Sequence, residues 1–421
     1  TLTIFSDNQR NLFSASLLFL IVILLNACNC QSTTSYKTLL PVYADLDELR
    51  QSVKSSLSRP LKNPGKIYYK DGFVFINEIK EGIHIVDNRD PRNPRKVSFV
   101  EIPGNFDLAI KGNVLYADSY IDLLALDIAN PEEIEILTRL EGVFENQYYQ
   151  EGDALVTEWK EEWVTETTSY NCNNGLDEAQ AEVVPFVDAR GEALLSGGST
   201  SSGIGGSLAR FTISGDFLYT VDETQLRLFD IAQPQNPMET LDLPLGWGIE
   251  TIFPYRDKLF IGSRIGMHIY DNSNPAQPTY VSTYEHVESC DPVVVQDDYA
   301  YVTLRSGNFC NNDINQLDVI DISDIESPNL VKSYPMDNPH GLGIQDSLLF
   351  ICEGDFGLKL FDANDPMTID QHLLLTFPDL HSYDVIPLGR VLLMIGEDGL
   401  YQFDYSRALE LELLSVIPIE R

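Results

Sequence analysis

One strand-and-turn pattern recurs along the chain and limits its fold more than any other feature. An alternating apolar stretch ends in an aspartate and is followed by a turn rich in Asn and Pro, as in Gly82–Pro94 and Leu226–Pro237. Eight aspartates close such stretches: Asp87, Asp127, Asp188, Asp230, Asp271, Asp321, Asp362 and Asp404. Most are 40 to 42 residues apart, with longer gaps of 61 before Asp188 and 50 before Asp321. A regular period of this length indicates a repeat architecture.

Each repeat predicts four short strands. In residues 211–244 we expect strands at 211–213, 217–221, 226–229 and 238–243, separated by turn signals that include Gly215-Asp216. Four such strands in about 40 residues are typical of a propeller blade. We therefore predict an all-β chain whose residues 61–421 form a single β-propeller of eight four-stranded blades. Asp188 would close the third strand of blade three, with an insertion at about 160–200. Seven blades, with this region as an excursion, is the alternative.

The repeated aspartates themselves are best explained as scaffold residues. An Asp side chain at such a turn can accept a backbone N–H two residues further on, while Pro fixes φ. Because the repeat places these aspartates, we favour this structural role over calcium binding or catalysis.

The N-terminus predicts a secreted and lipid-anchored protein. Residues 16–28 read SLLFLIVILLNAC, and their apolar core is too short for a stable membrane-spanning helix, which needs roughly 20 residues. Leu25, Ala27 and Cys28 resemble a bacterial lipobox, so residues 1–27 would be the signal peptide and Cys28 the lipidation site. An ordinary secretory signal with an incidental cysteine is the alternative.

Residues 28–60 are expected to form a tether and a clasp against the ring. Residues 36–43 could add an edge strand, and residues 45–57 predict a helix capped by Asp45 with Glu48 at N3. Residues 411–419 would supply the outer strand of the last blade.

The strand-turn motif is similar to the LVIVD repeat, as in GIHIVDNRDPRNP from Gly82 and LRLFDIAQPQNP from Leu226. This resemblance implies a bacterial β-propeller protein, often a lipoprotein. It implies an envelope location but no known reaction. With Asn29 after the lipidated cysteine, the outer membrane is favoured.

Charge and cysteines limit partners and chemistry. The net charge is −36, and no basic stripe is visible, so nucleic acid is excluded as a partner.

In an oxidising envelope, Cys290 and Cys310 could form a disulfide, with two unpaired thiols as the alternative. Cys352 lies in a buried-strand pattern, and Cys172 has no evident partner. We expect a monomer.

Candidate ligand residues lie where first strands begin, since these positions converge at one mouth of a propeller. The predicted site comprises Asp107, Arg210, Glu250, Asp291, His340 and Asp384. Its four carboxylates favour a cationic or hydroxyl-rich ligand, and a divalent cation is possible although no cofactor is predicted. The competing site is the insertion, with Trp163 and Tyr170.

We expect a non-catalytic scaffold that binds protein or glycan. The alternative is a metal-assisted hydrolase or lyase at the mouth.

Overall fold

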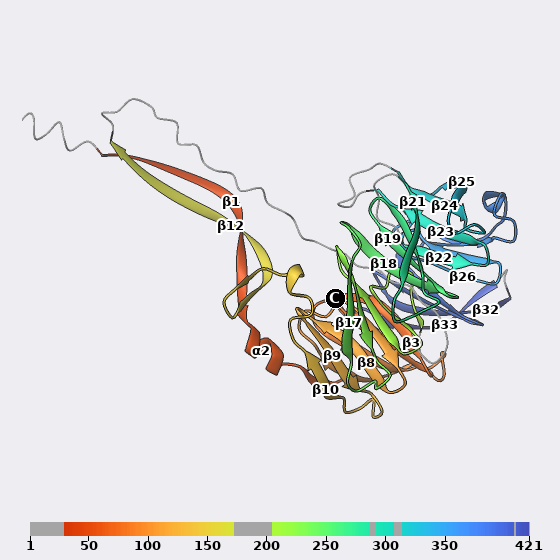
Figure 1. The fold of residues 1–421 in the computed structure, drawn as a ribbon, viewed down its shortest axis with the longest axis horizontal. Coiled ribbons are helices and arrows are strands. Elements are labelled where there is room, and N and C mark those ends of the chain that lie inside the picture. The colour runs from red at the N-terminus through yellow and green to blue at the C-terminus, as the bar shows by residue number, and fades with distance from the viewer. Residues whose placement is uncertain (1–28, 172–203, 287–291, 307–313, 408–409, 421) are drawn as a thin grey trace, which may run out of the picture. The chain divides into compact units, whose positions relative to one another are not determined.

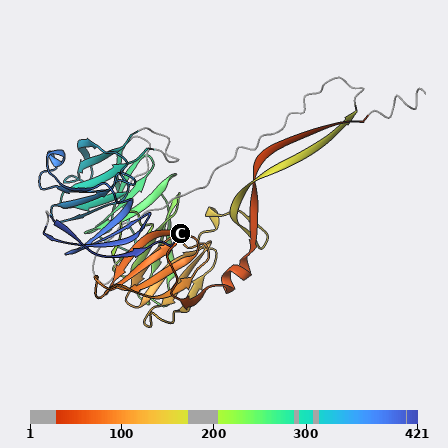
Figure 2. The same cartoon turned by 180° about the vertical axis from the view of Figure 1, so that it is seen from behind.

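The computed structural model describes residues 29–171, 204–286, 292–306, 314–407 and 410–420. The chain divides into two compact units, one formed by residues 1–43 and 156–190 and the other by residues 44–155 and 191–421. The second unit contains seven antiparallel sheets, which Figures 1 and 2 show from opposite sides. Six of them have four strands in consecutive order, and the seventh has six strands, of which four are consecutive. In each sheet the first strand is innermost, as in a propeller blade.

The first four blades span residues 64–285. Blade 1 has β3 (Pro64–Lys70), β4 (Phe73–Glu78), β5 (Gly82–Asp87) and β6 (Arg95–Glu101). Blade 2 has β7 (Leu108–Lys111), β8 (Val114–Ser119), β9 (Asp122–Asp127) and β10 (Glu135–Leu140). Blade 3 has β14 (Phe211–Ser214), β15 (Phe217–Val221), β16 (Gln225–Asp230) and β17 (Met238–Pro244). Blade 4 has β18 (Ile249–Tyr255), β19 (Lys258–Ser263), β20 (Gly266–Asp271) and β21 (Thr279–Glu285).

The last three blades span residues 293–418. Blade 5 has β22 (Val293–Gln296), β23 (Tyr299–Leu304), β24 (Gln316–Asp321) and β25 (Asn329–Pro335). Blade 6 has β26 (Leu342–Gln345), β27 (Leu348–Cys352), β28 (Leu358–Asp362) and β29 (Leu373–Phe377). Blade 7 has β30 (Ser382–Leu388), β31 (Val391–Gly396), β32 (Gly399–Arg407) and β33 (Glu410–Pro418). Short 3₁₀ turns, η1 (Glu145–Gln147) and η2 (Ile369–Gln371), lie between strands.

The all-β class is confirmed, and the described residues form seven blades, the number given as the alternative. The segment expected to build the extra blade contains β11 (Gln150–Glu151) and β12 (Ala154–Asn171). These strands form a separate three-stranded sheet with β1 (Asn29–Asp45), in the order β1-β12-β11. Pairing with a strand far earlier in the chain therefore takes β12 out of the ring. Asp188 lies outside the described residues.

The repeated aspartates act as the sequence predicts. In all seven blades, the repeated aspartate at or near the end of the third strand accepts the backbone N–H two residues later, at distances from 2.8 to 3.3 Å. A carboxylate held in this way reproduces a backbone turn. The scaffold role of these residues is therefore confirmed.

The turn that follows each aspartate also links neighbouring blades. The Tyr116 hydroxyl donates to the Pro234 carbonyl at 2.7 Å, and the Tyr219 hydroxyl donates to the Pro275 carbonyl at 2.8 Å. Ser415 of blade 7 donates in the same manner to Pro91 of blade 1, at 2.6 Å. The repeat thus supplies both a turn and a hydrogen-bond acceptor for the adjacent blade.

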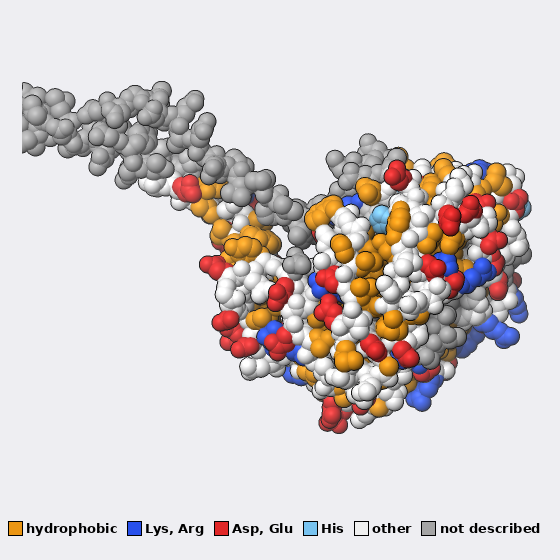
Figure 3. All heavy atoms as spheres, in the orientation of Figure 1, with side chains coloured by type: hydrophobic (Ala, Val, Ile, Leu, Met, Phe, Trp, Pro, Cys, Tyr) orange, Lys and Arg blue, Asp and Glu red, His pale blue; other side chains and the backbone are white. Residues whose placement is uncertain are grey.

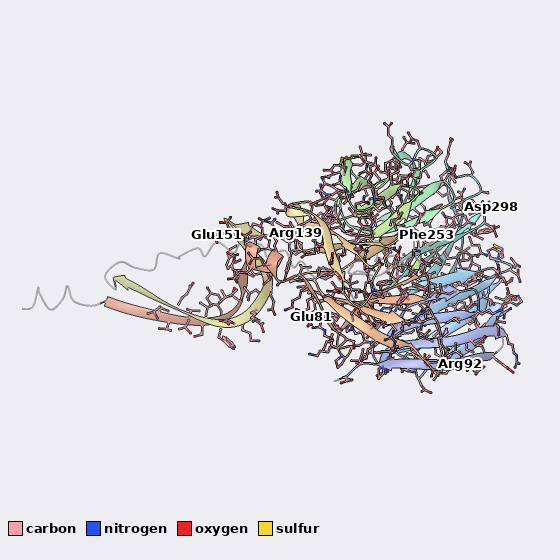
Figure 4. All side chains as sticks on the ribbon, turned by 90° about the horizontal axis from the view of Figure 1, so that it is seen from below. Glu81, Arg92, Arg139, Glu151, Phe253 and Asp298 are labelled. Atoms are coloured by element: carbon pink, nitrogen blue, oxygen red, sulfur yellow. The ribbon has the colours of Figure 1, made fainter. Side chains whose placement is uncertain are left out.

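The ring closes between blades 7 and 1 through side chains and a single backbone bridge. Leu61 bridges Ile419, and Asn88 and Gln402 exchange two hydrogen bonds of 2.9 and 2.7 Å. Arg92 lies on this seam, where Figure 4 shows it beside the strands of the last blade, and pairs with Glu412 at 2.9 Å. The last blade uses β33 as its own outer strand, as expected.

The segment before the ring departs from the predicted clasp. Helix α2 (Leu46–Gln51) is capped by Asp45, which accepts from the Glu48 N–H at 3.0 Å, but the helix is shorter than expected. Its continuation forms β2 (Lys54–Leu57), which pairs with β6 as an additional outer strand of blade 1. The predicted edge strand at 36–43 lies within β1. None of the described helices is long and apolar enough to cross a membrane.

Candidate ligand site at the mouth of the propeller

The predicted site residues belong to one end of the ring. Contacts between innermost strands run in order through β3, β7, β14, β18, β22, β26 and β30, and β31 of the last blade returns to β3. Every first strand runs in the same direction along the axis in such a ring. The residues at their starts therefore meet at one mouth, together with the loops between second and third strands.

Residues 204–210, which we call the crossing segment, run along the innermost strands and reach this mouth. Strand β13 (Ile204–Gly205) pairs with the axial side of β3 in blade 1. Next, the Ser207 hydroxyl contacts blades 6 and 7, and the Ala209 carbonyl accepts from Ile252 of blade 4 at 2.8 Å. Arg210 then leads into blade 3. Residues 204–207 thus form a packed connection between the blades.

Asp107 is buried beneath this segment and serves the fold. Its Oδ2 accepts from Lys66 Nζ at 2.6 Å, from the Arg210 N–H at 2.5 Å and from the Phe211 N–H at 3.0 Å. Its Oδ1 accepts from the Leu108 N–H at 2.7 Å. The carboxylate therefore ties blades 1, 2 and 3 together, and its lone pairs are engaged.

Asp118 supports the same buried cluster from β8. Its Oδ1 accepts from Asn105 Nδ2 at 2.7 Å and from the N–H groups of Phe106 and Asp107 at 2.9 and 2.8 Å. Burial raises the pKa of Asp118 to about 6, and burial also lowers the pKa of Lys66. Lys66 is 1% exposed, so this ion pair with Asp107 is shielded from solvent.

Asp384 is completely buried between two glycines. A Cβ on Gly206 would lie 1.7 Å from Oδ2, and a Cβ on Gly341 would lie 2.2 Å from Oδ1. Oδ1 accepts from the Ser207 hydroxyl at 3.0 Å, whereas Oδ2 has no hydrogen-bond partner among the described residues. Burial raises the pKa of Asp384 to about 8, so its carboxyl is neutral at pH 7.

The side of the mouth formed by blades 3 to 6 has a different composition, and we call it the open half. It carries Arg210, Glu250, Arg264, Arg305 and His340. Glu250 accepts from Arg264 Nε at 3.2 Å, and the charges of Arg210 and Arg305 act on the same carboxylate. Burial raises the pKa of Glu250, and the three guanidinium groups oppose that rise. Three cations thus surround one carboxylate.

His340 presents an unused donor to this half. Its Nε2 lies 3.1 Å from Arg305 Nη1 and 3.2 Å from Asn338 Nδ2. Because guanidinium nitrogen can only donate, Nε2 is the acceptor and the proton is on Nδ1. That Nδ1 is buried without a hydrogen-bond partner among the described residues. Burial and the charge of Arg305 lower the pKa of His340 to about 3, so the ring is neutral.

Apolar side chains project from loops at the same end of the ring. Trp247 precedes β18 and is 58% exposed, Ile265 connects β19 to β20 and is 56% exposed, and Phe356 connects β27 to β28 and is 51% exposed. We call these three residues the apolar rim. The Trp247 loop lies against Arg264, whose N–H donates to the Gly248 carbonyl at 2.8 Å. Figure 3 shows that exposed hydrophobic side chains lie among charged ones over the propeller surface.

The described residues of the predicted site therefore lie at one mouth but have different roles. Asp107 and Asp384 are buried structural groups, whereas Arg210, Glu250 and His340 belong to the open half. Asp291 lies outside the described residues, as do Cys28, Cys172, Cys290 and Cys310. Cys352 is buried and unpaired, as its strand pattern predicted. In the competing site, Trp163 is 68% exposed and lies under Lys37 Nζ, and the side chain of Tyr170 lies outside the described part.

Sequence reasoning missed Lys66, Asp118, Ser207, Arg264 and Arg305. Asp118, Arg264 and Arg305 belong to ends of second strands and the loops that follow them, which face the same mouth as the first-strand entries. Searching both sets of positions in each repeat would have found these three. Ser207 had no such signal, because its place depends on the crossing segment.

A metal site does not emerge from the described residues. No group of three or more His, Cys, Asp or Glu side chains within them is arranged to hold an ion. The acceptor atoms of Asp107 and the Oδ1 of Asp118 are directed at N–H groups and at Lys66.

The geometry defines the class of protein as a β-propeller with an asymmetric mouth. The sequence model of the LVIVD repeat matches residues 205–242 and 289–335. These two segments are thus LVIVD repeats, and there the resemblance drawn from the strand-turn motif is confirmed. No protein of curated function matches the sequence.

Several solved structures are similar in fold. The computationally designed protein Ika8 has 10% identity and a TM-score of 0.51, covering 86% of this chain and 89% of its own. BamB from Moraxella catarrhalis has 9% identity and a TM-score of 0.49, covering 89% and 97%. Hsv2 from Kluyveromyces lactis has 11% identity and a TM-score of 0.46, covering 83% and 97%. The likeness to Ika8 supports the fold alone.

Proposed function

We propose that this protein is a non-catalytic binding scaffold of the bacterial cell envelope. It would be held at the membrane, with the outer membrane favoured, by lipid on Cys28 and would recognise a protein partner through the open half of the propeller mouth. The repeat fold supports a binding role at the level of class. The lipobox-like sequence before Cys28 supports the anchor.

The observation that carries the proposal is the apolar rim next to a group of guanidiniums. Aromatic residues and arginine are enriched where protein interfaces gain most of their binding energy. Trp247, Ile265 and Phe356 are each more than half exposed. This combination favours a protein over a glycan, because aliphatic Ile265 adds apolar contact but no ring for a sugar to stack on.

The test replaces the apolar rim and compares it with a matched surface. In the tagged full chain, Trp247, Ile265 and Phe356 are changed to Ser, and the control changes Met238, Tyr280 and Leu373 of outer strands, which are 54%, 59% and 47% exposed. Partners are recovered from envelope fractions and quantified by mass spectrometry. We expect a partner that is lost with the rim variant and retained with the control. Loss with the control alone, or with neither, contradicts the proposal.

A further inference from the structure

Building on the proposed function, we infer that the open half of the mouth binds its partner through a single carboxylate of the partner, flanked by an apolar group. This reverses the expectation from sequence that four carboxylates favour a cationic or hydroxyl-rich ligand. The reversal follows from counting which donors and acceptors at the mouth are already used.

The acceptors at the mouth are largely occupied by the protein itself. All four close contacts of Asp107 come from N–H groups and Lys66, and Asp118 receives three further N–H groups on one oxygen. Asp384 is sealed between Gly206 and Gly341 with no exposure. These carboxyl groups hold the blades and the crossing segment together, so they are not available to attract a cationic ligand.

Arg210 and His340 supply donors that the described residues leave without an acceptor. Arg210 is partly exposed, forms no ion pair or side-chain hydrogen bond within the described residues, and has a buried Nε without a partner. His340 is 8% exposed, and its Nδ1–H also lacks an acceptor there. A buried N–H without a partner costs roughly 1–3 kcal/mol, so a ligand oxygen that reaches either group recovers that cost.

Charge in the open half points to the same ligand. Arg264 Nε donates to Glu250 at 3.2 Å, while Arg210 and Arg305 add two further positive charges that act on this carboxylate. An additional carboxylate would balance this group. Guanidinium and carboxylate match in shape and form charge-assisted hydrogen bonds, which are stronger than neutral ones.

The rest of the molecule limits how much negative charge the ligand can carry. The chain has a net charge of −36, so a polyanion is repelled at long range, whereas one carboxylate is attracted at short range. The apolar rim then favours a hydrophobic group next to that carboxylate. A protein segment in which one carboxylate adjoins apolar side chains meets both requirements.

The test uses small probes of different charge, of which the acid and its amide are a matched pair. N-acetyl-phenylalanine and N-acetyl-phenylalaninamide are titrated into the purified full chain by calorimetry, with phenethylamine as the cationic probe and inorganic phosphate as an anion without an apolar group. We expect saturable millimolar binding of N-acetyl-phenylalanine. Binding of the amide, the amine and phosphate should be weaker by about tenfold or more, the scale expected when one partner of a buried charge pair is lost.

Substitutions test whether N-acetyl-phenylalanine binds in the open half of the mouth. Arg210→Gln should weaken binding of N-acetyl-phenylalanine by about tenfold or more. Arg92→Gln, which also removes one positive charge but lies on the seam between blades 7 and 1, should leave it unchanged. Circular dichroism of each variant checks that the fold is retained. Equal binding of acid and amide, tighter binding of the amine, no saturable binding, or indifference to Arg210→Gln each overturns the inference.

The inference and the proposed function fail in different ways. If the apolar rim variant loses the partner but the acid probe does not bind, the mouth remains the recognition surface and only its anion preference is wrong. If the acid probe binds through Arg210 but no partner depends on the rim, the inference stands and the scaffold function is wrong.

Discussion

Asp384 is a carboxyl group whose environment favours its neutral form. The folded protein holds its proton up to a pKa of about 8, while an unfolded chain releases it near the ordinary value of 3.8. Between these values the folded state binds more protons than the unfolded state. The free energy of unfolding should therefore fall as pH rises from about 4 to about 8, with the full contribution present at the acidic end.

Replacing Asp384 by Asn tests this directly. Asn keeps the shape and the acceptor for Ser207 but has no proton to lose, so its contribution should not change with pH. We expect Asp384→Asn to be more stable than the wild type above pH 8 by roughly 1–3 kcal/mol. Near pH 5 the stability of the variant relative to the wild type should be much lower. Urea unfolding at both pH values provides the measurement. An unchanged difference between wild type and variant would mean that Asp384 is charged in the fold.

Gly206 is required by close approach. An added methyl group would lie 1.7 Å from Asp384 Oδ2, deep in the packed mouth. Gly206→Ala should therefore destabilise the protein by more than about 2 kcal/mol. The comparison is Gly215→Ala, where no atom lies within 4 Å of the added methyl group. There the loss of stability should be about 1–2 kcal/mol, because it arises from the φ of +60° alone.

A second change separates crowding from other causes. In Gly206→Ala combined with Asp384→Ala, the methyl group has space, so part of the lost stability should return in thermal unfolding. If the double variant is as unstable as the sum of the two single changes, the crossing segment does not pack on Asp384 in this way.

Individual residues differ in how far sequence could predict them. The turn aspartates were predictable because the interaction spans only two residues of chain. Asp107 and Asp384 were placed at the correct end of the ring, but their burial was not foreseen. It depends on residues 204–209, whose Gly-rich sequence reads locally as a linker.

At the scale of elements, the seam between blades 7 and 1 holds the ring closed. Asn88 and Gln402 are 3% and 0% exposed, and each amide satisfies the other. Asn88→Ala leaves the amide of Gln402 buried without its partner, so we expect a loss of roughly 1–3 kcal/mol in urea unfolding. Asn93→Ala, which removes an exposed hydrogen bond to Asp90 in the nearby turn, should cost within about 0.5 kcal/mol.

The coupling between the two amides gives the decisive comparison. Once Asn88 is truncated, Gln402→Ala removes an already unsatisfied group, so the double variant should be no less stable than Asn88→Ala alone. Additive losses from the two changes would show that they act independently and that the pair does not close the ring.

Strand positions were predictable because the alternation and turns repeat locally. In blade 3, the expected strands at 211–213, 217–221, 226–229 and 238–243 differ from the observed ones by one residue at most. The partner of β12 was not predictable. Its alternation is like that of a blade strand, but it hydrogen-bonds to β1, where Ser35 and Thr165 side chains meet at 2.9 Å. No local pattern marks a pairing across 130 residues.

At the scale of the whole molecule, membrane attachment is predicted to depend on Cys28. Acyl chains contribute membrane affinity with each buried methylene, so the unmodified chain should lose its anchor. Cys28→Ala should move the protein from the membrane to the soluble or unprocessed fraction in cell fractionation. Cys30→Ala, two residues away, is the matched control and should stay in the membrane. Unchanged membrane association of Cys28→Ala would contradict lipid anchoring.

The central claim is that the open half of the mouth is the recognition surface. Site-specific photo-crosslinking in intact cells tests it most directly, with a photoreactive amino acid placed singly at Trp247, at Tyr280 on an outer strand, or at Trp163 in β12. These side chains are 58%, 59% and 68% exposed, so their access to solvent is similar. The account predicts one discrete protease-sensitive adduct from position 247 and none from the other two. An adduct from position 163 or 280 alone, or one at 247 removed by glycosidases but not by protease, would contradict it.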